Sequence, residues 1–235
     1  MNKGCILIPT YNEVENIKNL ILKIRQYLTD IQIYVIDDNS PDGTANIVRK
    51  IEETDMNVRL IFRPKKNGLG AAYIHGMTVA AEKEFDFVIM MDSDFSHNPK
   101  HLPTMIENIQ KYDVVIGSRY VKGGGIKNWP MYRKLMSFAA NYMIKIFLKA
   151  NVKDSTTGYR CIKTNILKKI KFETIHSQGY SFLYEMLWRI EGVGARIKEI
   201  PIIFIDRQFG QTKISQGEIL KAMTMLVRLN FSRKF

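Results

Sequence analysis

Residues 87–99, FVIMMDSDFSHNP, join a run of five apolar residues directly to two carboxylates that stand one residue apart. A short apolar run bounded by turn residues predicts a buried strand, which here ends at Met91. Alternate residues of an extended chain point to the same side, so Asp92 and Asp94 can direct their charges to one place. Because unpaired carboxylates repel each other, we expect a cation or a positively charged ligand beside them.

Apolar strand-like runs and helix-period segments alternate on both sides of this stretch. The expected strands are residues 4–9, 31–36, 57–62, 87–91 and 113–117, and the expected helices are residues 12–28, 43–53, 69–82 and 99–111. This alternation predicts an α/β fold in which helices cover both faces of a mostly parallel sheet. Asn12 is expected to cap the first helix, with Glu15 as its capping-box partner.

The pattern changes after about residue 120, where a glycine-rich stretch predicts a loop. Beyond it, helices are expected at residues 131–150, at 180–191 and from 216, with an extended segment at 195–205. We therefore expect one α/β domain followed by a C-terminal helical appendage. Their boundaries are residues 1–213, divided into halves 1–119 and 120–213, and residues 214–235.

The composition is that of a folded protein, because 46% of the 235 residues are hydrophobic and can form a sizeable core. Two cysteines, Cys5 and Cys161, are too few for a disulfide framework or a cysteine metal site, and we expect both in the core. The N-terminus lacks the features of a secretory signal, and no window approaches the roughly 18 apolar residues of a membrane-spanning helix. These observations predict a cytoplasmic protein.

The net charge of +12 is concentrated in one half of the chain. Residues 1–119 carry 14 Lys and Arg against 16 Asp and Glu, whereas residues 120–235 carry 21 against 7. The second half, with a net charge of +14, predicts an anionic partner, which could be a nucleic acid, a phosphorylated small molecule or an anionic membrane surface. General solubility would also explain the charge.

Polar sequences follow four of the expected strands, and the carboxyl ends of parallel strands share one edge of the sheet. The sequences are PTYNE at residues 9–13, DDNSPDG at 37–43, DSD at 92–94 and GSRY at 117–120. Turn chemistry alone accounts for Asp42 and Gly43. It does not account for the carboxylates of Asp37, Asp38, Asp92 and Asp94 at one edge. Carboxylates are ligands for Mg²⁺ or Mn²⁺, which characteristically also bind substrate phosphates, so we expect a diphosphate ligand.

Other phosphate-binding and metal-binding motifs do not fit. GLGAAY at residues 68–73 has Tyr73 where a dinucleotide-binding motif needs its third glycine, and it follows the third strand rather than the first. The sequence contains no Walker A motif. The four histidines lack zinc-site spacing, although His97 and His101 stand four apart. We expect both at turns or at the surface, and His97 is the one that could support a metal ligand.

A longer set of motifs extends over nearly the whole chain. The motifs are PTYNEVENI (9–17), VIDDNSPDGTA (35–45), GLGAAYIHGM (68–77), MMDSDFSHNP (90–99), VIGSRYVKGGGIKNW (115–129), DSTTGYRC (154–161), GYSFLYEM (179–186) and EIPIIFIDRQFGQTKIS (199–215). Together they resemble the family 2 glycosyltransferases of GT-A fold, specifically the polyprenyl-phosphate or dolichyl-phosphate mannose synthases. The resemblance implies a Rossmann-like GT-A sheet with C-terminal amphipathic helices. It also implies an inverting enzyme that uses Mg²⁺ or Mn²⁺ to transfer mannose from GDP-mannose to a polyprenyl phosphate.

The resemblance also assigns roles to individual residues. Residues 1–119 would bind the nucleotide sugar, and residues 120–213 would bind the acceptor and supply a closing loop. The implied donor site consists of Pro9, Tyr11, Glu13, Ile36, Asp38, Asp92, Ser93, Asp94, Arg119, Arg207 and Lys213. The implied metal ligands are Asp92 and Asp94, the acceptor-phosphate ligands Arg119, Arg133 and Ser137, and the catalytic residues Asp94 and Arg119. Asp37 would have a structural role, and Ser96 stands where some relatives place a glutamine ligand to the metal.

Two segments of the basic half combine apolar and basic residues. Residues 131–150 interleave large apolar side chains with Lys134, Lys145 and Lys149, and the final helix has the same character. Both helices fit a membrane interface beside an isoprenoid tail, and an ordinary core helix would look similar, so both interpretations stay open. The resemblance implies a peripheral protein at the cytoplasmic face of a membrane. It would bind there through its own contacts with anionic lipid or through a small membrane partner.

Three alternatives remain open from the sequence. A polyprenyl-phosphate glycosyltransferase that uses UDP-glucose or UDP-GlcNAc would have the same general motifs, and donor competition would distinguish it. A nucleic-acid-binding protein should carry basic or aromatic readout elements, and strand-end carboxylates are unsuited to a phosphate backbone without metal. A non-catalytic membrane-surface module would have no need of the two aspartates. The resemblance therefore favours an enzyme without a nucleic-acid partner.

Overall fold

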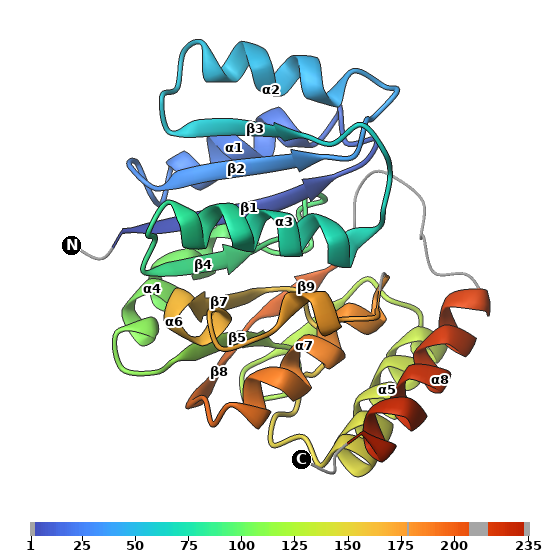
Figure 1. Ribbon diagram of the computed structural model, residues 1–235. Coiled ribbons are helices and arrows are strands. Elements are labelled where there is room, and N and C mark those ends of the chain that lie inside the picture. The colour runs from blue at the N-terminus through green and yellow to red at the C-terminus, as the bar shows by residue number, and fades with distance from the viewer. Residues whose placement is uncertain (1–2, 178, 207–215, 233–235) are drawn as a thin grey trace.

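One large sheet determines the architecture. In the computed structural model, which describes residues 3–177, 179–206 and 216–232, seven strands are ordered β3-β2-β1-β4-β7-β5-β8 (Figure 1). They are β1 (Gly4–Thr10), β2 (Gln32–Asp37), β3 (Val58–Phe62), β4 (Phe87–Met90), β5 (Val114–Ser118), β7 (Arg160–Lys163) and β8 (Ile197–Pro201). Neighbouring strands are parallel except at β7, which runs antiparallel to both β4 and β5. The predicted α/β fold with a mostly parallel sheet is confirmed.

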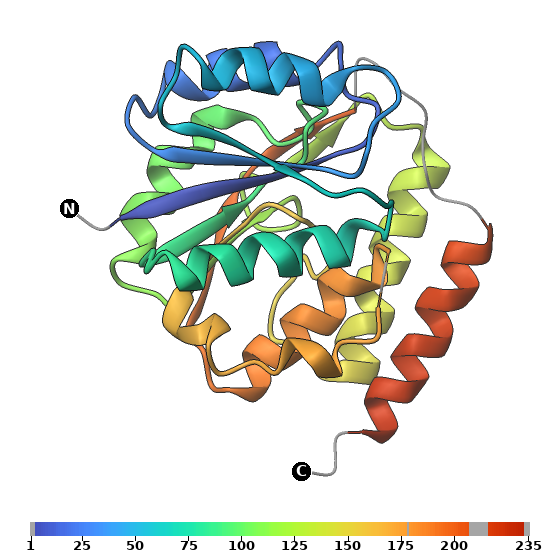
Figure 2. The ribbon, with the colours of Figure 1, turned by 45° about the horizontal axis from the view of Figure 1, so that its top comes forward.

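Helices cover both faces of this sheet. They are α1 (Ile17–Arg25), α2 (Thr44–Glu52), α3 (Leu69–Glu82), α4 (Leu102–Ile109), α6 (Thr164–Leu167) and α7 (Ser181–Gly192), with the short 3₁₀ turns η1 (Pro99–His101) and η2 (Phe172–Thr174). Side chains alternate along each strand, so Ile6 and Ile8 pack with α1, α2 and α4, whereas Leu7 packs with α3, α6 and α7. Figure 2 shows α1 and α2 on one side of the sheet and α3 and α7 on the other.

Two short strands were not among the expected elements. Strand β7 has only four residues and starts with a charged one, so its sequence shows no strand pattern, and its place depends on pairing with β4 and β5. Strand β6 (Gly125–Lys127) lies in the glycine-rich stretch and pairs in parallel with β9 (Ile203–Ile205) in a separate two-stranded sheet. Both depend on partners distant in sequence, which local patterns do not reveal.

The prediction that Asn12 caps the first helix is wrong. Helix α1 begins at Ile17, and Asn12 has a left-handed backbone with a φ of 60°. The N–H groups of Glu13 and Val14 donate instead to Thr44 Oγ1 and Asp42 Oδ2, both at 3.0 Å. These bonds join the segment after β1 to the loop after β2, so the two loops are held side by side at the edge of the sheet.

The C-terminal helices form a separate layer at one end of the molecule. Helix α5 (Met131–Leu148) and helix α8 (Gln216–Phe231) lie side by side in both views (Figures 1 and 2). Leu226 and Leu229 of α8 pack with Ile144 and Leu148 of α5 in a small core that also includes Tyr184 of α7. Among the described helices, none has the length and apolar character needed to cross a bilayer. The division of the chain at residue 213 stays a prediction.

Candidate active site

A cleft of about 980 Å³ lies at the carboxyl ends of β1, β2 and β4. The start of α3, residues 175–177 and 179–181, and Thr224 and Met225 of α8 complete its walls. Seven of the predicted site residues line it, namely Pro9, Tyr11, Glu13, Asp38, Asp92, Ser93 and Asp94. The structure therefore brings most of the predicted donor residues together, as expected where parallel strands end.

Asp37 organises the edge of the sheet rather than lining the cleft. Its side chain is fully buried and accepts hydrogen bonds from Thr10 Oγ1 at 2.9 Å, from Ser40 N at 2.9 Å and from Ser40 Oγ at 2.6 Å. These donors satisfy both carboxylate oxygens and fix the turn after β2. The structural role expected for Asp37 agrees with these contacts.

Asp38, the next residue, faces the cleft beside Arg63. Asp38 Oδ1 lies 3.2 Å from Arg63 Nη1, and Asp38 Oδ2 accepts from the backbone N–H of Asn67 at 3.3 Å. Burial raises the pKa of Asp38, and the charge of Arg63 opposes that effect. In the described part of the chain, neither Asp38 Oδ1 nor Arg63 Nη1 has a partner with hydrogen-bond geometry. This end of the cleft can therefore bind polar groups of a ligand.

The loop before α3 forms one rim of the cleft, which the sequence did not reveal. Lys66 Nζ lies 3.5 Å from the ring centre of Tyr11, a close cation–π contact. Gly68 has a φ of 86°, and a side chain at Gly70 would meet the carbonyl oxygen of Ser177 at 2.9 Å. The glycines of GLGAAY thus permit this turn and the close approach of α3 to the opposite wall. They do not form a dinucleotide-binding loop.

Asp92 and Asp94 stand together at the floor of the cleft. The Asp92 side chain is 36% exposed and accepts from the Tyr73 hydroxyl at 3.4 Å, whereas Asp94 is 8% exposed and accepts from Ser96 N at 3.1 Å. Among the described residues there is no cluster of three or more His, Cys, Asp and Glu that could hold a metal by itself. A metal bound here would complete its coordination with water and with the phosphate oxygens of a substrate. Mg²⁺ is usually bound in proteins in this way.

Arg119 lies outside the lining of this cleft, in a buried ion pair. Its Nε and Nη2 donate to the two oxygens of Asp154, both at 2.7 Å, and its backbone N–H donates to the same carboxylate at 2.9 Å. Burial alone would lower the pKa of Arg119, but the charge of Asp154 raises it. Burial likewise opposes ionisation of Asp154, yet Arg119 keeps its pKa below the usual value. Asp154 was not among the residues expected to take part in the site.

Arg133 and Ser137 meet Arg119 around two aromatic rings. The guanidinium of Arg133 lies 4.1 Å from the ring centre of Trp129, and that of Arg119 lies 5.8 Å from it. Arg119 also stacks on Tyr120, whose hydroxyl donates to Ser137 Oγ at 2.8 Å. The three residues assigned to the acceptor phosphate are therefore neighbours. Arg133 is at the same time paired with Asp206, at 2.9 and 3.1 Å.

Of the predicted donor residues that the structure describes, Ile36 is also absent from the cleft lining. The side chain of Ile36 is fully buried in the core, where it packs against Gly76 of α3. Arg207 and Lys213 lie outside the described residues. The assignment of Ile36 to the nucleotide therefore gains no support from its side chain.

The sequence matches the family described as glycosyl transferase family 2 over residues 5–175. The chain belongs to glycosyl transferase family 2. The undecaprenyl-phosphate mannosyltransferase of Micrococcus luteus is 37% identical over 229 residues, which cover 97% of this chain and 94% of that protein. The polyprenol monophosphomannose synthase of Mycolicibacterium smegmatis is 36% identical over 220 residues, covering 93% and 83%. These relatives confirm the predicted resemblance to polyprenyl-phosphate mannose synthases.

Solved glycosyltransferases share the fold of this family 2 chain. A mannosyltransferase from Pyrobaculum calidifontis, in complex with GDP-Man and Mn²⁺, has a TM-score of 0.63 at 16% identity, covering 98% of this chain and 63% of that chain. Glucosyl-3-phosphoglycerate synthase from Mycobacterium tuberculosis, in complex with Mn²⁺, UDP and glucosyl-3-phosphoglycerate, has a TM-score of 0.66 at 15% identity, covering 99% and 80%. At these identities the likeness concerns the fold, and it confirms the predicted GT-A architecture.

One wall of the cleft in this family 2 glycosyltransferase is held by a residue that the sequence did not single out. Glu185 of α7 is fully buried and accepts from the N–H groups of His176 and Ser177, at 3.4 and 3.0 Å. Arg189, one helical turn later, donates to the same carboxylate at 2.8 Å. The acidic residue within the apolar run GYSFLYEM was the available signal, because a buried carboxylate needs partners of this kind.

Proposed function

We propose that this protein is an inverting mannosyltransferase that transfers mannose from GDP-mannose to a polyprenyl phosphate, giving polyprenyl-phosphate mannose and GDP. The observation that carries the proposal is the pair of strand-end carboxylates, Asp92 and Asp94, in the lining of the cleft. The names of the two curated relatives support the sugar and the acceptor class, and the GDP-Man complex of the structural neighbour supports the donor.

The donor set fits a divalent metal, Mg²⁺ or Mn²⁺, held by Asp92 and Asp94. Both carboxylates line the cleft, and two of them leave most coordination positions of such an ion to water and diphosphate oxygens. When bound, the metal would supply positive charge against the departing diphosphate. Arg207 and Lys213 would add further positive charge there, as the resemblance implies. Ser93, between the aspartates, would contact the nucleotide.

The rest of the cleft would position the nucleotide and the sugar. Asp38, at the buried polar end, would accept hydrogen bonds from the base or the ribose, with Ile36 contributing at most its backbone. Pro9, Tyr11 and Glu13 would form the nucleotide wall next to it. The sugar would then lie between the two aspartates and the opposite wall, which residues 175–177 and 179–181 form.

The chemistry we propose is direct displacement at the anomeric carbon. A phosphate oxygen of the acceptor forms the new bond on the face opposite the diphosphate, and the bond to GDP breaks, which inverts the configuration. A phosphate monoester with a second pKa of about 6 is largely dianionic at neutral pH, so no protein base is required. Arg119, Arg133 and Ser137 would hold that phosphate, since the planar guanidinium suits phosphate oxygens.

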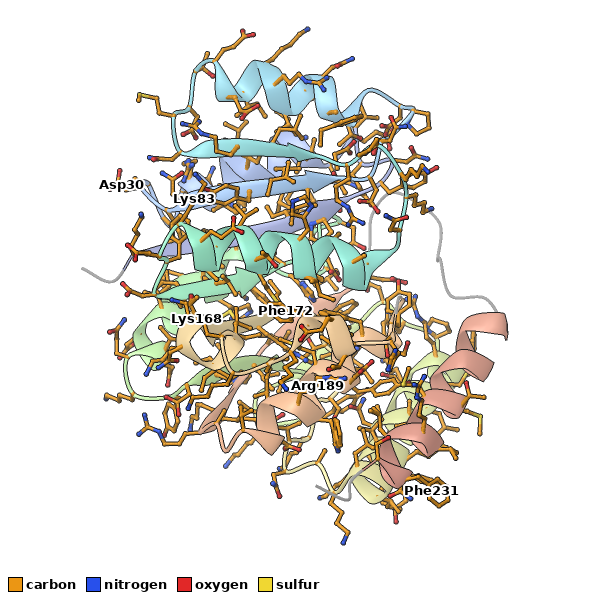
Figure 3. The ribbon with its side chains drawn as sticks, viewed as in Figure 1. Asp30, Lys83, Lys168, Phe172, Arg189 and Phe231 are labelled. Atoms are coloured by element: carbon orange, nitrogen blue, oxygen red, sulfur yellow. The ribbon has the colours of Figure 1, made fainter. Side chains whose placement is uncertain are left out.

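The exposed face of α5 and α8 supports a place for the protein at a membrane surface. On α5, Met131, Leu135, Phe138, Tyr142 and Ile146 follow one another at helical spacing and are 56–77% exposed. On α8, Met223, Val227 and Phe231 are also exposed, and Phe231 lies at the C-terminal end of the helix (Figure 3). A core helix would bury such a stripe, whereas a helix at a lipid interface presents it outward among basic residues.

The experiment that tests the proposal measures transfer of labelled sugar to a short polyprenyl phosphate from GDP-mannose, UDP-glucose or UDP-GlcNAc. Each donor is tested with Mg²⁺, with Mn²⁺ and with chelator. Metal-dependent formation of a lipid-phosphate mannose from GDP-mannose alone is the expected result. Transfer from a UDP-sugar alone would overturn the choice of donor, and no transfer from any donor would overturn the enzymatic proposal.

A further inference from the structure

We propose that His97 is a positioning residue for the metal-binding aspartates and that Tyr159 fixes it in place. The inference rests on the proposed role of Asp92 and Asp94, and it deepens that role by identifying the groups that hold both residues in one conformation. His97 belongs to the loop of residues 92–98, which lies between the end of β4 and η1, and Tyr159 packs against the His97 ring.

The His97 side chain forms a hydrogen bond back to the start of its own loop, residues 92–98. The backbone N–H of Asp92 donates to His97 Nδ1 at 2.9 Å. Because Nδ1 accepts this hydrogen bond, the proton of the neutral ring must be on Nε2. Nε2 in turn lies 3.7 Å from Asp92 Oδ2. One ring therefore faces both the backbone and the carboxylate of the same aspartate.

The ring of Tyr159 packs against one face of the His97 ring. His97 is 1% exposed, and its ring stacks on that of Tyr159 with the centres 4.8 Å apart and the planes inclined by only 10°. The Tyr159 hydroxyl donates to the carbonyl oxygen of Asn98 at 3.1 Å, so Tyr159 also anchors the far end of the loop. Tyr159 directly precedes β7, the strand paired with β4. The support thus belongs to the sheet itself.

The loop needs such support because its own conformation is unfavourable. Phe95, between Asp94 and His97, has a φ of 63°, in the left-handed region that bulky side chains rarely adopt. Such backbone persists only where surrounding contacts determine it. Within the loop, Ser96 N donates to Asp94 Oδ1 at 3.1 Å, which ties the second aspartate to the same turn. His97 and Tyr159 hold the two ends of this strained segment.

A metal with only two protein ligands depends on those ligands being held in place before it binds. Removing a group that orients a metal ligand typically lowers metal affinity by about 10- to 100-fold. The contacts of His97 give it this orienting role toward Asp92. The His97 ring also packs edge-on against Phe204, with the ring centres 6.1 Å apart, and Phe204 lies next to Trp129 of the proposed acceptor site. His97 contacts Asp92 directly and reaches Arg133 only through these two rings, so we expect its loss to act on metal binding and an apolar replacement beside Phe204 to leave the acceptor site unaffected.

The test measures the Mn²⁺ dissociation constant in the presence of saturating GDP, by electron paramagnetic resonance of free Mn²⁺. His97→Leu keeps an apolar side chain against Tyr159 but cannot accept from Asp92, and we expect the dissociation constant to rise about 10- to 100-fold. His97→Asn offers an amide oxygen as acceptor and should restore part of the affinity. Tyr159→Phe keeps the stacked ring without the hydroxyl and should cause a smaller rise.

His101→Leu is the matched control, because His101 lies four residues further on and has no contact with the aspartates that the structure records. Its Mn²⁺ affinity should equal that of the natural protein. The KM for a short polyprenyl phosphate should stay unchanged in His97→Leu, which separates an effect on the metal site from general loss of structure.

The outcomes distinguish this inference from the proposed function. If the natural protein binds Mn²⁺ and GDP independently of each other, the proposed metal role of the aspartates fails. If its binding is coupled and a folded His97→Leu variant keeps full Mn²⁺ affinity, the positioning role of His97 is overturned. Should His97→Leu not fold, ¹⁵N resonances of the natural protein decide, because a protonated Nδ1 would contradict the proposed hydrogen bond and an unprotonated Nδ1 would support it.

Discussion

At the scale of single residues, the aspartates in and around the cleft fall into two groups with different expected roles. Asp37 and Asp154 are fully buried, and neighbouring donors satisfy them. Asp38, Asp92 and Asp94 line the cleft, where a ligand can reach them. The first group should matter for stability, and the second for binding and transfer.

Asp94→Asn should remove sugar transfer while leaving the fold intact. The amide keeps an oxygen that can accept from Ser96 N, but it loses the negative charge that a metal requires. We expect turnover to fall by at least about 100-fold, the loss typical of removing one charge-stabilising group from an active site. Transfer assays and thermal unfolding measure the two effects. Asp30→Asn, at the opposite edge of the sheet, is the control, and strong activity in Asp94→Asn would contradict the assignment.

Asp154→Asn should destabilise the protein by about 3–5 kcal/mol at neutral pH, because it leaves the buried charge of Arg119 without its partner. Urea unfolding of both proteins measures this difference. Asp55→Asn, which breaks the more exposed pair with Arg25, should cost at most about 1 kcal/mol. An equal loss of unfolding free energy in the two variants would show that burial does not increase the contribution of the Arg119–Asp154 pair to stability.

The same ion pair predicts a pH dependence. The pKa of Asp154 is lowered in the folded state, so its ionisation stabilises the protein above the unfolded pKa of about 3.9. That contribution is lost as the pH falls through the lower, folded value. The stability difference between the natural protein and Asp154→Asn should therefore shrink below about pH 4. Urea titrations across this range check the sign, and a difference that grew on acidification would contradict it.

At the scale of elements, helix α5 combines two functions on different faces. Its first turns carry Arg133 and Ser137 toward Trp129 and Tyr120, and its outward stripe of apolar side chains faces solvent. Ile144 and Leu148 pack the helix against α8. A single helix thus links the proposed phosphate site to the proposed lipid surface.

Arg133→Gln should weaken use of the acceptor and leave the donor unaffected. Loss of one charge-assisted hydrogen bond should raise the KM for a short polyprenyl phosphate by about 10- to 100-fold. The dissociation constant for GDP should not change, because Arg133 lies outside the lining of the cleft. Lys134→Gln, the next residue on α5, is the matched control. A normal KM in Arg133→Gln would remove Arg133 from the acceptor site.

Leu135→Glu should reduce binding to lipid vesicles by at least about 10-fold, because it replaces the burial of a large apolar side chain with a charge. Vesicle sedimentation measures the binding. Leu22 on α1 is a similarly exposed leucine, at 55% against 67%, so Leu22→Glu is the control. Transfer to a short acceptor in solution should be normal in both variants. Unchanged vesicle binding of Leu135→Glu would remove α5 from the membrane surface.

The sequence predicted the elements whose signals are local. The strand ending at Met91 and the helix at residues 69–82 were predicted because apolar periodicity and flanking turn residues are contained within each segment. Strand β7 and the start of α1 were missed because distant partners decide them. Seven residues that the motifs singled out line the cleft, and their roles stay predictions. Lys66, Asp154 and Glu185 act through contacts that no motif spacing encodes.

At the scale of the whole molecule, the charge of the chain is divided between its two halves. Residues 1–119 carry a net charge of −2 and supply most of the proposed donor site, whereas residues 120–235 carry +14 and supply the proposed acceptor and membrane surfaces. An anionic lipid surface would attract the second half and orient the protein on it.

This division predicts that binding to vesicles containing phosphatidylserine weakens as salt concentration rises. The distance over which charges interact falls from about 10 Å at 0.1 M salt to about 3 Å at 1 M. Binding to neutral phosphatidylcholine vesicles should change far less, because the apolar contribution of α5 and α8 is not screened. Parallel sedimentation series with the two lipids measure the difference. Equal salt dependence would contradict an electrostatic role for the basic half.

Because β7 lies between β4 and β5, the large sheet cannot be completed until β7 has been synthesised. Strands β4 and β5 are made first during synthesis, yet they pair only through β7, which arrives more than forty residues after β5 ends. A nascent chain that stops before residue 160 therefore has one unpaired edge on β4 and two on β5, because β8 also comes later, and such edges are sites for pairing with other chains. The donor half is consequently expected to aggregate when produced alone, and a gene split near residue 119 should yield activity only when both fragments are synthesised together.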